Sequence, residues 1–331
     1  ANLDLTVVTT AAAEGPQAFT VVATAAGETR TIREVIAVRT LRLPERESLG
    51  VRLGDEQTMT LAAGWASKGL HAEVTIDSSP DRQLRPALEA MLEYPYGCCE
   101  QTSSRGMALA ACAALLPRLY EDPAQAPKAL PLVQTAVDRV FAMQNTRGGF
   151  GWWMSDRSDD AFLTVHVMDF LLQAREVGAE LPVNGLARAT ERLLEFAATA
   201  GEIDVRCHAI EVLARLGRTV QPRLDWLCAQ PVGTEARARL ATALAVLGER
   251  PRAATLLQHG TEFVMPSAAS NRTLASPIRA QALLLRAQLA IDPGHPSLPG
   301  QVAALQRQLL RPQYLSTQEM AQGLRAVADY Y

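Results

Sequence analysis

From Pro80 to its last residue the chain repeats segments of helical hydrophobic periodicity, and no other sequence feature constrains its fold as strongly. Leu109, Cys112 and Leu116 lie on one apolar stripe at helical spacing. Residues 160–177 carry apolar side chains on nearly all sides, which is typical of a helix that is buried all round. Further helical stretches are expected at about 128–143, 184–198, 203–216, 234–247, 276–290, 299–310 and 316–329.

Helices with more and with fewer apolar positions alternate along this run, and short turns rich in Pro and Gly separate them. Such an alternation predicts a closed ring of helix pairs, an α/α toroid. A helical solenoid would have the same periodicity, so the pattern by itself leaves both architectures open.

The residues before Pro80 are predicted to form antiparallel β structure, because they carry short alternating runs and no sustained helical period. The expected strands are at residues 3–8, 18–24, 32–39, 58–61 and 71–76. A stretch rich in proline and charge at 41–48 divides them, so we expect parts of two small β-sandwiches. The predicted fold class is therefore mainly α, an α/α toroid preceded by antiparallel β-sandwich segments.

The composition of the 331 residues excludes several classes of protein. Hydrophobic residues make up 48% and charged residues 20%, so the chain can bury a sizeable core and is not disordered throughout. A net charge of -3 leaves no basic excess for nucleic acid, and no apolar run approaches the roughly 18 residues of a membrane span. Five cysteines make no disulfide framework, and no spacing of Cys and His predicts a metal site, so we expect no metal and no cofactor.

The segment with most chemical content is Tyr-Pro-Tyr-Gly-Cys-Cys-Glu-Gln-Thr-Ser-Ser-Arg, at residues 94–105. Thr102 and the two serines after it are good N-cap residues, so a helix is expected to begin here and to run through residues 107–119. Cys98 and Gln101 are three residues apart in a turn opened by Gly97, and side chains at this spacing lie close together.

A cysteine thiol beside a glutamine amide favours one reaction in particular. The thiolate attacks the amide carbon, ammonia leaves, and an internal thioester remains. The start of a helix should assist this reaction, because free N–H groups stabilise the developing charge and lower the pKa of the thiol. The alternative is a pair of inert cysteines beside a capping glutamine, which the Cys-x-x-Gln spacing alone would favour.

The longer string closely resembles the thioester motif of the bacterial α2-macroglobulins. These are related to the animal α2-macroglobulins and the complement thioester proteins, which carry a Gly-Cys-Gly-Glu-Gln core. The resemblance implies that Cys98 supplies the sulfur, Gln101 the acyl carbon and Glu100 the acid of the motif. The supporting residues of the motif are Tyr94, Pro95, Tyr96 and Gly97. Cys99 at the variable position is a departure that adds a second thiol, able to compete through thiol exchange.

The resemblance extends over roughly residues 82–331. The segment 145–153 resembles the family's Gly-Phe loop, and residues 314–319, with a Ser-x-x-Glu capping box, resemble the start of its last inner helix. The implied parts are the end of a macroglobulin-type β-sandwich at 1–45, the first part of a flanking β domain at 46–80, and an α/α toroid thioester domain at 81–331. The chain is then expected to be a fragment of a longer protein.

The function implied by this resemblance is that of a protease trap, not of an enzyme. A protease cuts a bait region elsewhere in the parent protein, and the exposed thioester then acylates a lysine or hydroxyl group of the attacker in a single turnover. The expected partners are target proteases and the other domains of the parent, in bacterial defence. The family is typically periplasmic and often tethered to the membrane by a lipid. The fragment itself is expected to be a monomer without direct membrane contact.

Aromatic residues near the motif are candidates for shielding a thioester from water. They are Phe150, Trp152 and Trp153, together with Tyr94 and Tyr96. The other explanation is that they close one face of the toroid, and the two explanations are compatible.

No catalytic histidine is assigned. His166 and His208 lie within helical runs, where a lone histidine is more often structural.

Two other functions remain open. Isoprenoid cyclases are also toroids with Gly-Phe-Gly-Trp loops, and Asp156, Asp159 and Asp160 lie close together here. Those enzymes need Asp-x-Asp-Asp, however, and the spacing in this chain is one residue too long. The other alternative is a non-reactive interaction or structural module that retains the motif without forming the thioester.

Overall fold

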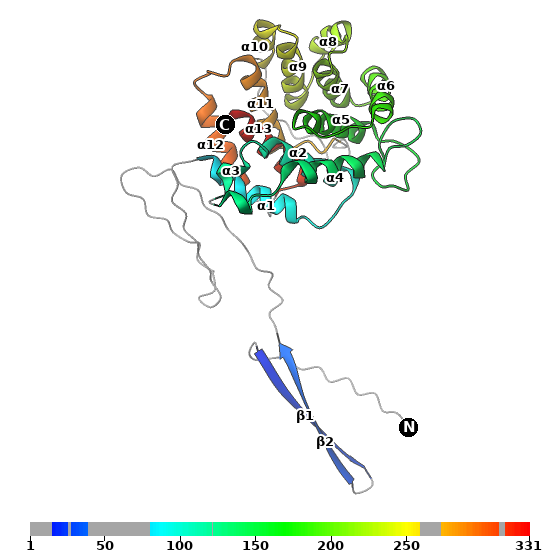
Figure 1. Ribbon diagram of the computed structural model, residues 1–331, viewed down its shortest axis with the longest axis vertical. Helices are drawn as coiled ribbons and strands as arrows, with labels where there is room; N and C mark the ends of the chain where they lie inside the picture. Colours follow the sequence, from blue (N-terminus) through cyan, green and yellow to red (C-terminus); the bar gives the residue numbers. More distant parts are fainter. Residues whose placement is uncertain (1–14, 26–27, 39–79, 121, 259–272, 311–314) are drawn as a thin grey trace, which may run out of the picture. The chain divides into compact units, whose positions relative to one another are not determined.

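Figure 1 shows the computed structural model, which describes residues 15–25, 28–38, 80–120, 122–258, 273–310 and 315–331. The chain divides into two compact units, Ala1–Arg46 and Glu47–Tyr331.

The described part of the first unit is a β-hairpin. Strands β1 (Gly15–Ala25) and β2 (Glu28–Val38) pair antiparallel along their full lengths. The predicted strands 18–24 and 32–39 fall on β1 and β2, except for residue 39, which lies outside the described residues. The strands predicted at 3–8, 58–61 and 71–76, the sandwiches they would build and the β domain at 46–80, apart from Pro80, also lie outside them.

The second unit is helical wherever the structure describes regular elements in it. The α-helices are α1 (Arg85–Glu93), α2 (Cys99–Cys112), α3 (Leu116–Leu119), α4 (Ala129–Phe141), α5 (Ala161–Glu176), α6 (Val183–Thr199), α7 (Ile203–Arg215), α8 (Gln221–Cys228), α9 (Thr234–Val246), α10 (Arg250–Gln258), α11 (Pro277–Ile291), α12 (Leu298–Leu309) and α13 (Thr317–Tyr330). Short 3-10 helices are η1 (Pro80–Leu84) and η2 (Pro123–Gln125).

The helical stretches predicted from periodicity correspond to α4, α5, α6, α7, α9, α11, α12 and α13. The single helix predicted through residues 107–119 is wrong. Helix α2 ends at Cys112 and the separate short helix α3 begins at Leu116. The cause is Pro117, which has no N–H to donate and whose ring would clash with the carbonyl of the preceding turn.

The helices form a closed ring. Inner helices contact one another in the order α2, α5, α7, α9, α11 and α13, and α13 contacts α2 again (Figure 1). The outer layer packs against them: α4 on α2 and α5, α6 on α5 and α7, α8 on α7 and α9, α10 on α9 and α11, and α12 on α11 and α13. This closure is the arrangement of an α/α toroid, and a solenoid would leave its first and last repeats apart.

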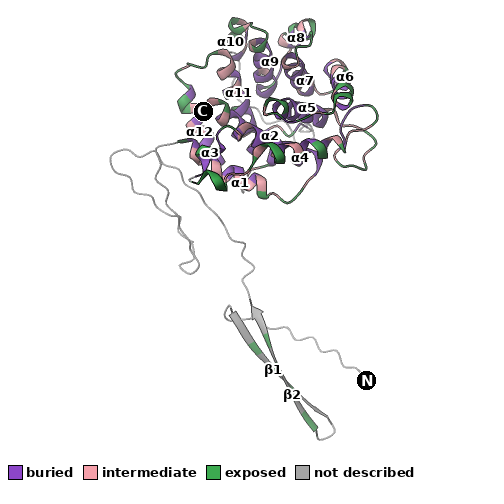
Figure 2. Ribbon diagram, viewed as in Figure 1, coloured by how far each residue is buried: buried purple, intermediate pink, exposed green. Residues whose placement is uncertain are grey.

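Burial distinguishes the inner helices from the outer ones. Every residue of α5 from Phe162 to Ala174 is buried, as predicted for the segment 160–177 (Figure 2). The outer helix α6 buries one stripe instead, which includes Ala189 and Leu193. The difference arises because an inner helix has protein on all sides, whereas an outer helix faces solvent on one side.

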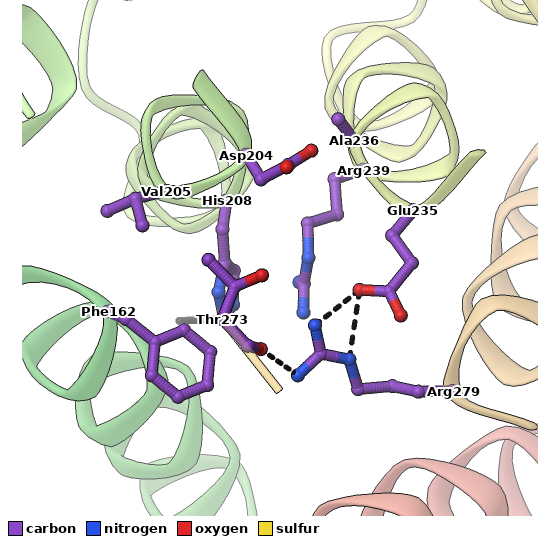
Figure 3. Close-up of a pocket in the computed structure, with 9 residues that line it drawn as sticks. All are labelled: Phe162, Asp204, Val205, His208, Glu235, Ala236, Arg239, Thr273 and Arg279. Carbon is purple, nitrogen blue, oxygen red and sulfur yellow. Dashed lines mark hydrogen bonds and ion pairs between the residues drawn. The ribbon is translucent and has the colours of Figure 1, made fainter. Parts of the chain in front are cut away.

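The inner helices begin at the same end of the ring. First-turn residues of α5, α7, α9 and α11, namely Phe162, Asp204, Glu235 and Arg279, line one cavity of about 10 Å³ (Figure 3). The start of α2 contacts the start of α13 through Glu100, whose carboxylate accepts a hydrogen bond from Thr317 Oγ1 at 2.9 Å. Carboxylates at this end lie near the positive ends of the helix dipoles, where they are stabilised.

The inside of the ring contains paired charges. The carboxylate of Asp169 in α5 is fully buried and accepts hydrogen bonds from Arg215 Nη1 at 2.5 Å and Arg325 Nη1 at 2.9 Å. Burial alone would raise the pKa of this carboxyl, but the charges of Arg325 and Arg215 and the hydrogen bond from His208 hold it well below its usual range. The charged network therefore ties α5, α7 and α13 together.

A small residue at position 106 is required where α2 crosses α5. A Cβ atom on Gly106 would overlap the ring of Phe170, which is fully buried and cannot move aside. We expect Gly106→Ala to reduce the free energy of unfolding by about 1–3 kcal/mol through overpacking. Gly300→Ala is the matched control, since a Cβ there meets no atom within 4 Å and should cause no loss. Equal stability of the two variants in urea unfolding would contradict this packing argument.

Candidate functional site

Cys98 and Gln101 meet at the start of α2 through two reciprocal hydrogen bonds. Cys98 is the N-cap of the helix, and its Sγ accepts from the backbone N–H of Gln101 at 3.5 Å. The backbone N–H of Cys98 in turn donates to Oε1 of Gln101 at 3.2 Å. This is a capping box in which a cysteine takes the place of the usual serine or threonine.

The prediction that Thr102 or the serines after it cap this helix is wrong. These residues lie within the first turns of α2, where their hydroxyls bond back to earlier groups of the segment. Thr102 Oγ1 donates to the carbonyl of Gly97 at 3.4 Å, and Ser103 Oγ donates to the carbonyl of Cys99 at 2.8 Å. Because of the capping box between Cys98 and Gln101, the N-cap of α2 is Cys98, four residues before Thr102.

The amide of Gln101 is held at both of its polar atoms. Its Oε1 accepts from Cys98 N–H, and its Nε2 donates to the hydroxyl of Tyr94 at 3.5 Å. The thiol of Cys98 is buried, and the Gln101 side chain is half-buried. The arrangement therefore presents a sulfur to an amide whose orientation is already defined.

The predicted lowering of the thiol pKa at the helix start is wrong for Cys98. Burial raises the pKa of this thiol, and the hydrogen bond from Gln101 N–H and the charge of Arg139 only partly offset it, while the charge of Glu100 raises it further. Burial also raises the pKa of the Cys99 thiol strongly, because its side chain lies wholly in the core. Cys99 is the less accessible of the two sulfurs.

Two arginines hold the loop that precedes Cys98. Arg105 Nη2 donates to the carbonyls of Tyr94 at 2.5 Å and Tyr96 at 3.0 Å. Arg139 of α4 donates through Nη2 to the carbonyl of Gly97 at 2.9 Å. A Cβ atom on Gly97 would lie 2.5 Å from that same Nη2, so a larger residue here would force the guanidinium of Arg139 to shift. Sequence reasoning missed Arg139, since nothing local connects it to a motif more than 30 residues away.

Glu100 joins the site to the end of the chain. Its buried carboxylate accepts from Ser104 Oγ at 2.6 Å, from Thr317 Oγ1 at 2.9 Å and from Gln318 Nε2 at 3.1 Å. Ser104 Oγ also lies 3.0 Å from Nε2 of His166. Glu100, the acid of the motif, thus has a structural role: it links the first turn of α2 to the first turn of α13.

The sequence at 314–319 predicts a capping box at the start of the last inner helix. The box is present at the start of α13, where Ser316 and Glu319 exchange hydrogen bonds, so this prediction is confirmed. It places Thr317 and Gln318 opposite Glu100. The sequence contained no signal that these two residues reach the motif.

The loop at residues 145–153, which resembles the family's Gly-Phe loop, contacts the motif through its backbone. The carbonyl of Trp152 accepts a hydrogen bond from Cys99 N–H at 2.9 Å. Phe150 is fully buried and packs edge-on to Phe141, so it belongs to the core, whereas Trp153 is 55% exposed. Trp152 is half-buried. The loop can turn here because Gly148 adopts a φ of 92°.

The shielding residues predicted from the sequence therefore lie in different environments. Tyr94 is half-buried and contacts the Gln101 amide, while Tyr96 is 64% exposed and meets Tyr94 edge-on with ring centroids 5.5 Å apart. Pro95 between them is exposed. Of these aromatic side chains, Tyr94 is the one with a described hydrogen bond to the Cys98 and Gln101 pair.

The three aspartates that suggested a cyclase are occupied in other ways. Asp159 pairs with Arg192 at 2.5 Å, Asp156 accepts from Trp153 N–H at 3.0 Å, and Asp160 caps α5 by accepting from Leu163 N–H at 2.9 Å. The cavity at the starts of the inner helices has room for about one water and contains the Glu235–Arg279 ion pair (Figure 3). The geometry therefore does not support a cyclase.

No group of three or more His, Cys, Asp and Glu side chains that could hold a metal ion occurs among the described residues. Within the same ranges, every helix is too short or too polar to cross a membrane.

Comparison with known proteins supports the resemblance seen in the motif, although no protein-family model matches the chain. The alpha-2-macroglobulin of Escherichia coli (strain K12) is 30% identical over 146 residues, which are 41% of this chain and 8% of that protein. The alpha-2-macroglobulin of Xylella fastidiosa (strain Temecula1) is 26% identical over 284 residues, 78% of this chain and 17% of that protein. The chain thus spans only a small part of the length of these curated relatives.

Solved structures agree with the helical ring. Salmonella alpha-2-macroglobulin reacted with methylamine matches 75% of this chain and 17% of its own, with 25% identity and a TM-score of 0.61. Escherichia coli alpha-2-macroglobulin activated by porcine elastase matches 71% of this chain and 23% of its own, with 27% identity and a TM-score of 0.58.

Loss of the Glu100 contacts should weaken the fold. Glu100→Gln leaves buried hydroxyls of Ser104 and Thr317 with a poorer acceptor, so we expect a loss of about 1–3 kcal/mol in the free energy of unfolding. Glu89→Gln is the matched control, because Glu89 makes a partly exposed pair with Arg85 that is worth less than about 1 kcal/mol. Urea unfolding measures both, and equal losses would refute the role assigned to Glu100.

Acid should destabilise the ring through two buried histidines. Burial lowers the pKa of His166 to about 3, and burial with the charge of Arg239 lowers the pKa of His208 to about 4. The unfolded chain then binds more protons than the fold below about pH 6.5. Stability is therefore full above that pH and falls as the pH drops toward 4. Urea midpoints across this range should show a shallower fall for His166→Gln than for His295→Gln, in which the substituted histidine lies in the partly exposed turn before α12.

Proposed function

We propose that this chain, whose homologues are bacterial alpha-2-macroglobulins, carries the reactive thioester of a protease-trapping protein. The observation that carries the proposal is the reciprocal hydrogen bonding of Cys98 and Gln101 at the start of α2. Proteins of this family are inhibitors and not catalysts, which agrees with a site that holds its own substrate amide within the chain.

The first step is formation of the thioester. Sγ of Cys98 attacks Cδ of Gln101, the bond from Cδ to Nε2 breaks, and ammonia leaves. The capping box supports this step in two ways. It holds sulfur and amide together, and it directs the N–H of Cys98 to Oε1, the oxygen that takes up negative charge during the attack.

The second step is capture of a protease. An amine of a lysine, or a hydroxyl, attacks the thioester carbonyl, an amide or ester bond forms to the protease, and Cys98 is released as a free thiol. Each molecule reacts once, because the sulfur cannot regain its acyl group. The related Escherichia coli protein has been activated by elastase and the related Salmonella protein has reacted with methylamine, which supports proteases and amines as reactants.

The remainder of the trap is proposed to lie in a longer parent protein, since the relatives are several times longer than this chain. The bait region and the domains that cover the thioester belong to that parent. A periplasmic location with a lipid tether fits such a defence role, and fractionation of the parent to the cytosol would argue against it.

One observation favours the non-reactive alternative. Burial raises the pKa of the Cys98 thiol, so the free cysteine is a poorer nucleophile than an exposed one at a helix start. In that case, the motif would serve only to begin α2 and to contact α13. The mass of the protein distinguishes the two functions directly.

The thioester can be tested by intact mass spectrometry of the full-length protein. We expect a mass lower than the sequence by one ammonia, and addition of one methylamine on treatment. Cys98→Ala should abolish both changes and covalent capture of a protease, because it removes the attacking sulfur. Cys99→Ala is the matched control and should leave capture largely intact. Capture that depends on Cys99 would mean that the other sulfur reacts, and an unmodified wild-type mass would support the non-reactive module.

A further inference from the structure

We propose that the hydroxyl of Tyr94 is a catalytic residue that transfers a proton to and from the nitrogen reacting at the Gln101 carbonyl. The inference rests on the proposed thioester function and extends it, since it assigns a group to the proton transfer at the reacting nitrogen. Its starting point is the contact between Tyr94 Oη and Gln101 Nε2 at 3.5 Å.

The position of Tyr94 is set from both sides. It follows the last residue of α1, and its backbone carbonyl accepts from Arg105 of α2 at 2.5 Å. Its ring meets the Tyr96 ring edge-on. The tyrosine is therefore tied to α2, the helix whose first turn contains Gln101, and its hydroxyl keeps its place relative to the amide.

Neighbouring polar groups are directed elsewhere. The carboxylate of Glu100 is turned toward α13, and Arg139 donates to the carbonyl of Gly97. His166 contacts Ser104 and is buried within the ring. Among the described hydrogen bonds, that of Tyr94 is the one that reaches the amide nitrogen.

Thioester formation requires a proton at this nitrogen. As the bond between Cδ and Nε2 breaks, Nε2 needs one more proton to leave as neutral ammonia. The Tyr94 hydroxyl donates that proton and regains one from water, while the proton of the Cys98 thiol passes to water. The sum is thiol plus amide giving thioester plus ammonia, with no other reactant.

Attack by an amine uses the same contact in reverse. The incoming nitrogen occupies the place that Nε2 leaves, and it must lose a proton as its bond to Cδ forms. Tyr94 Oη accepts this proton and passes its own to water, and the departing sulfur takes a proton to become the free thiol. The Tyr94 hydroxyl thus assists attack by an amine such as that of lysine, because the amine nitrogen takes the place of Gln101 Nε2.

The test compares Tyr94→Phe with the control Tyr330→Phe, at the last residue of α13, in the full-length protein. Phenylalanine keeps the ring and so keeps any shielding, but removes the hydroxyl. We expect Tyr94→Phe to lose ammonia more slowly after refolding and to release the Cys98 thiol with methylamine about 10²-fold more slowly, the usual size of a general acid–base contribution. Tyr330→Phe should match the wild type, since Tyr330 lies at the other end of α13 from the residues that contact the motif.

A second readout separates proton transfer from altered structure. The methylamine reaction of the wild type should slow in D2O, and Tyr94→Phe should lose this solvent isotope effect while its urea midpoint stays that of the wild type. Equal rates and equal isotope effects in Tyr94→Phe and wild type would overturn the role of the hydroxyl while leaving the thioester intact. A wild-type protein that never loses ammonia would instead overturn the proposed function, and with it this inference.

Discussion

The buried carboxylate of Glu100 joins the first and last inner helices, and both the closed ring and the site depend on that contact. It accepts hydrogen bonds from Ser104 in its own helix and from Thr317 and Gln318 at the start of α13. A buried carboxylate is costly unless its oxygens are satisfied, so the ends of the ring must meet for this residue to be tolerated. Because Cys98 and Gln101 flank Glu100 in sequence, the same contact fixes the turn in which their side chains meet.

Burial and proximity act in opposite directions on the thiol of Cys98. Burial raises its pKa and disfavours the thiolate, while the capping box holds the sulfur beside the amide of Gln101. A neutral thioester does not carry the desolvation cost of a buried thiolate, so the environment favours the bonded form of the sulfur over its charged form. The N–H of Cys98 also directs its dipole to the amide oxygen before any reaction, so little reorganisation is needed.

Helical periodicity predicted the longer helices well. Each of them buries either one face or all of its faces, and the apolar residues that do so recur at helical spacing in the sequence. The break between α2 and α3 is caused by one residue, Pro117, and the spacing of apolar residues does not show it. The site was predicted in part. The meeting of Cys98 and Gln101 follows from a spacing of three residues, whereas Arg139 and Thr317 reach the motif from distant helices. The pKa of Cys98 was predicted in the wrong direction, since burial depends on packing around the helix start.

The sequence by itself determined the local chemistry: which residues begin a helix together, which side chains are three apart, and which segments are apolar enough to lie inside. Those properties depend on neighbours along the chain. Only the tertiary structure decided between a ring and a solenoid, because closure requires α13 to contact α2 across more than 200 residues of sequence. It also decided that Glu100 fastens the ring, that Phe150 belongs to the core, and that Tyr94 faces the amide nitrogen. Burial and long-range hydrogen bonds depend on how helices pack against one another, and these contacts join residues far apart in sequence that meet only in the folded chain.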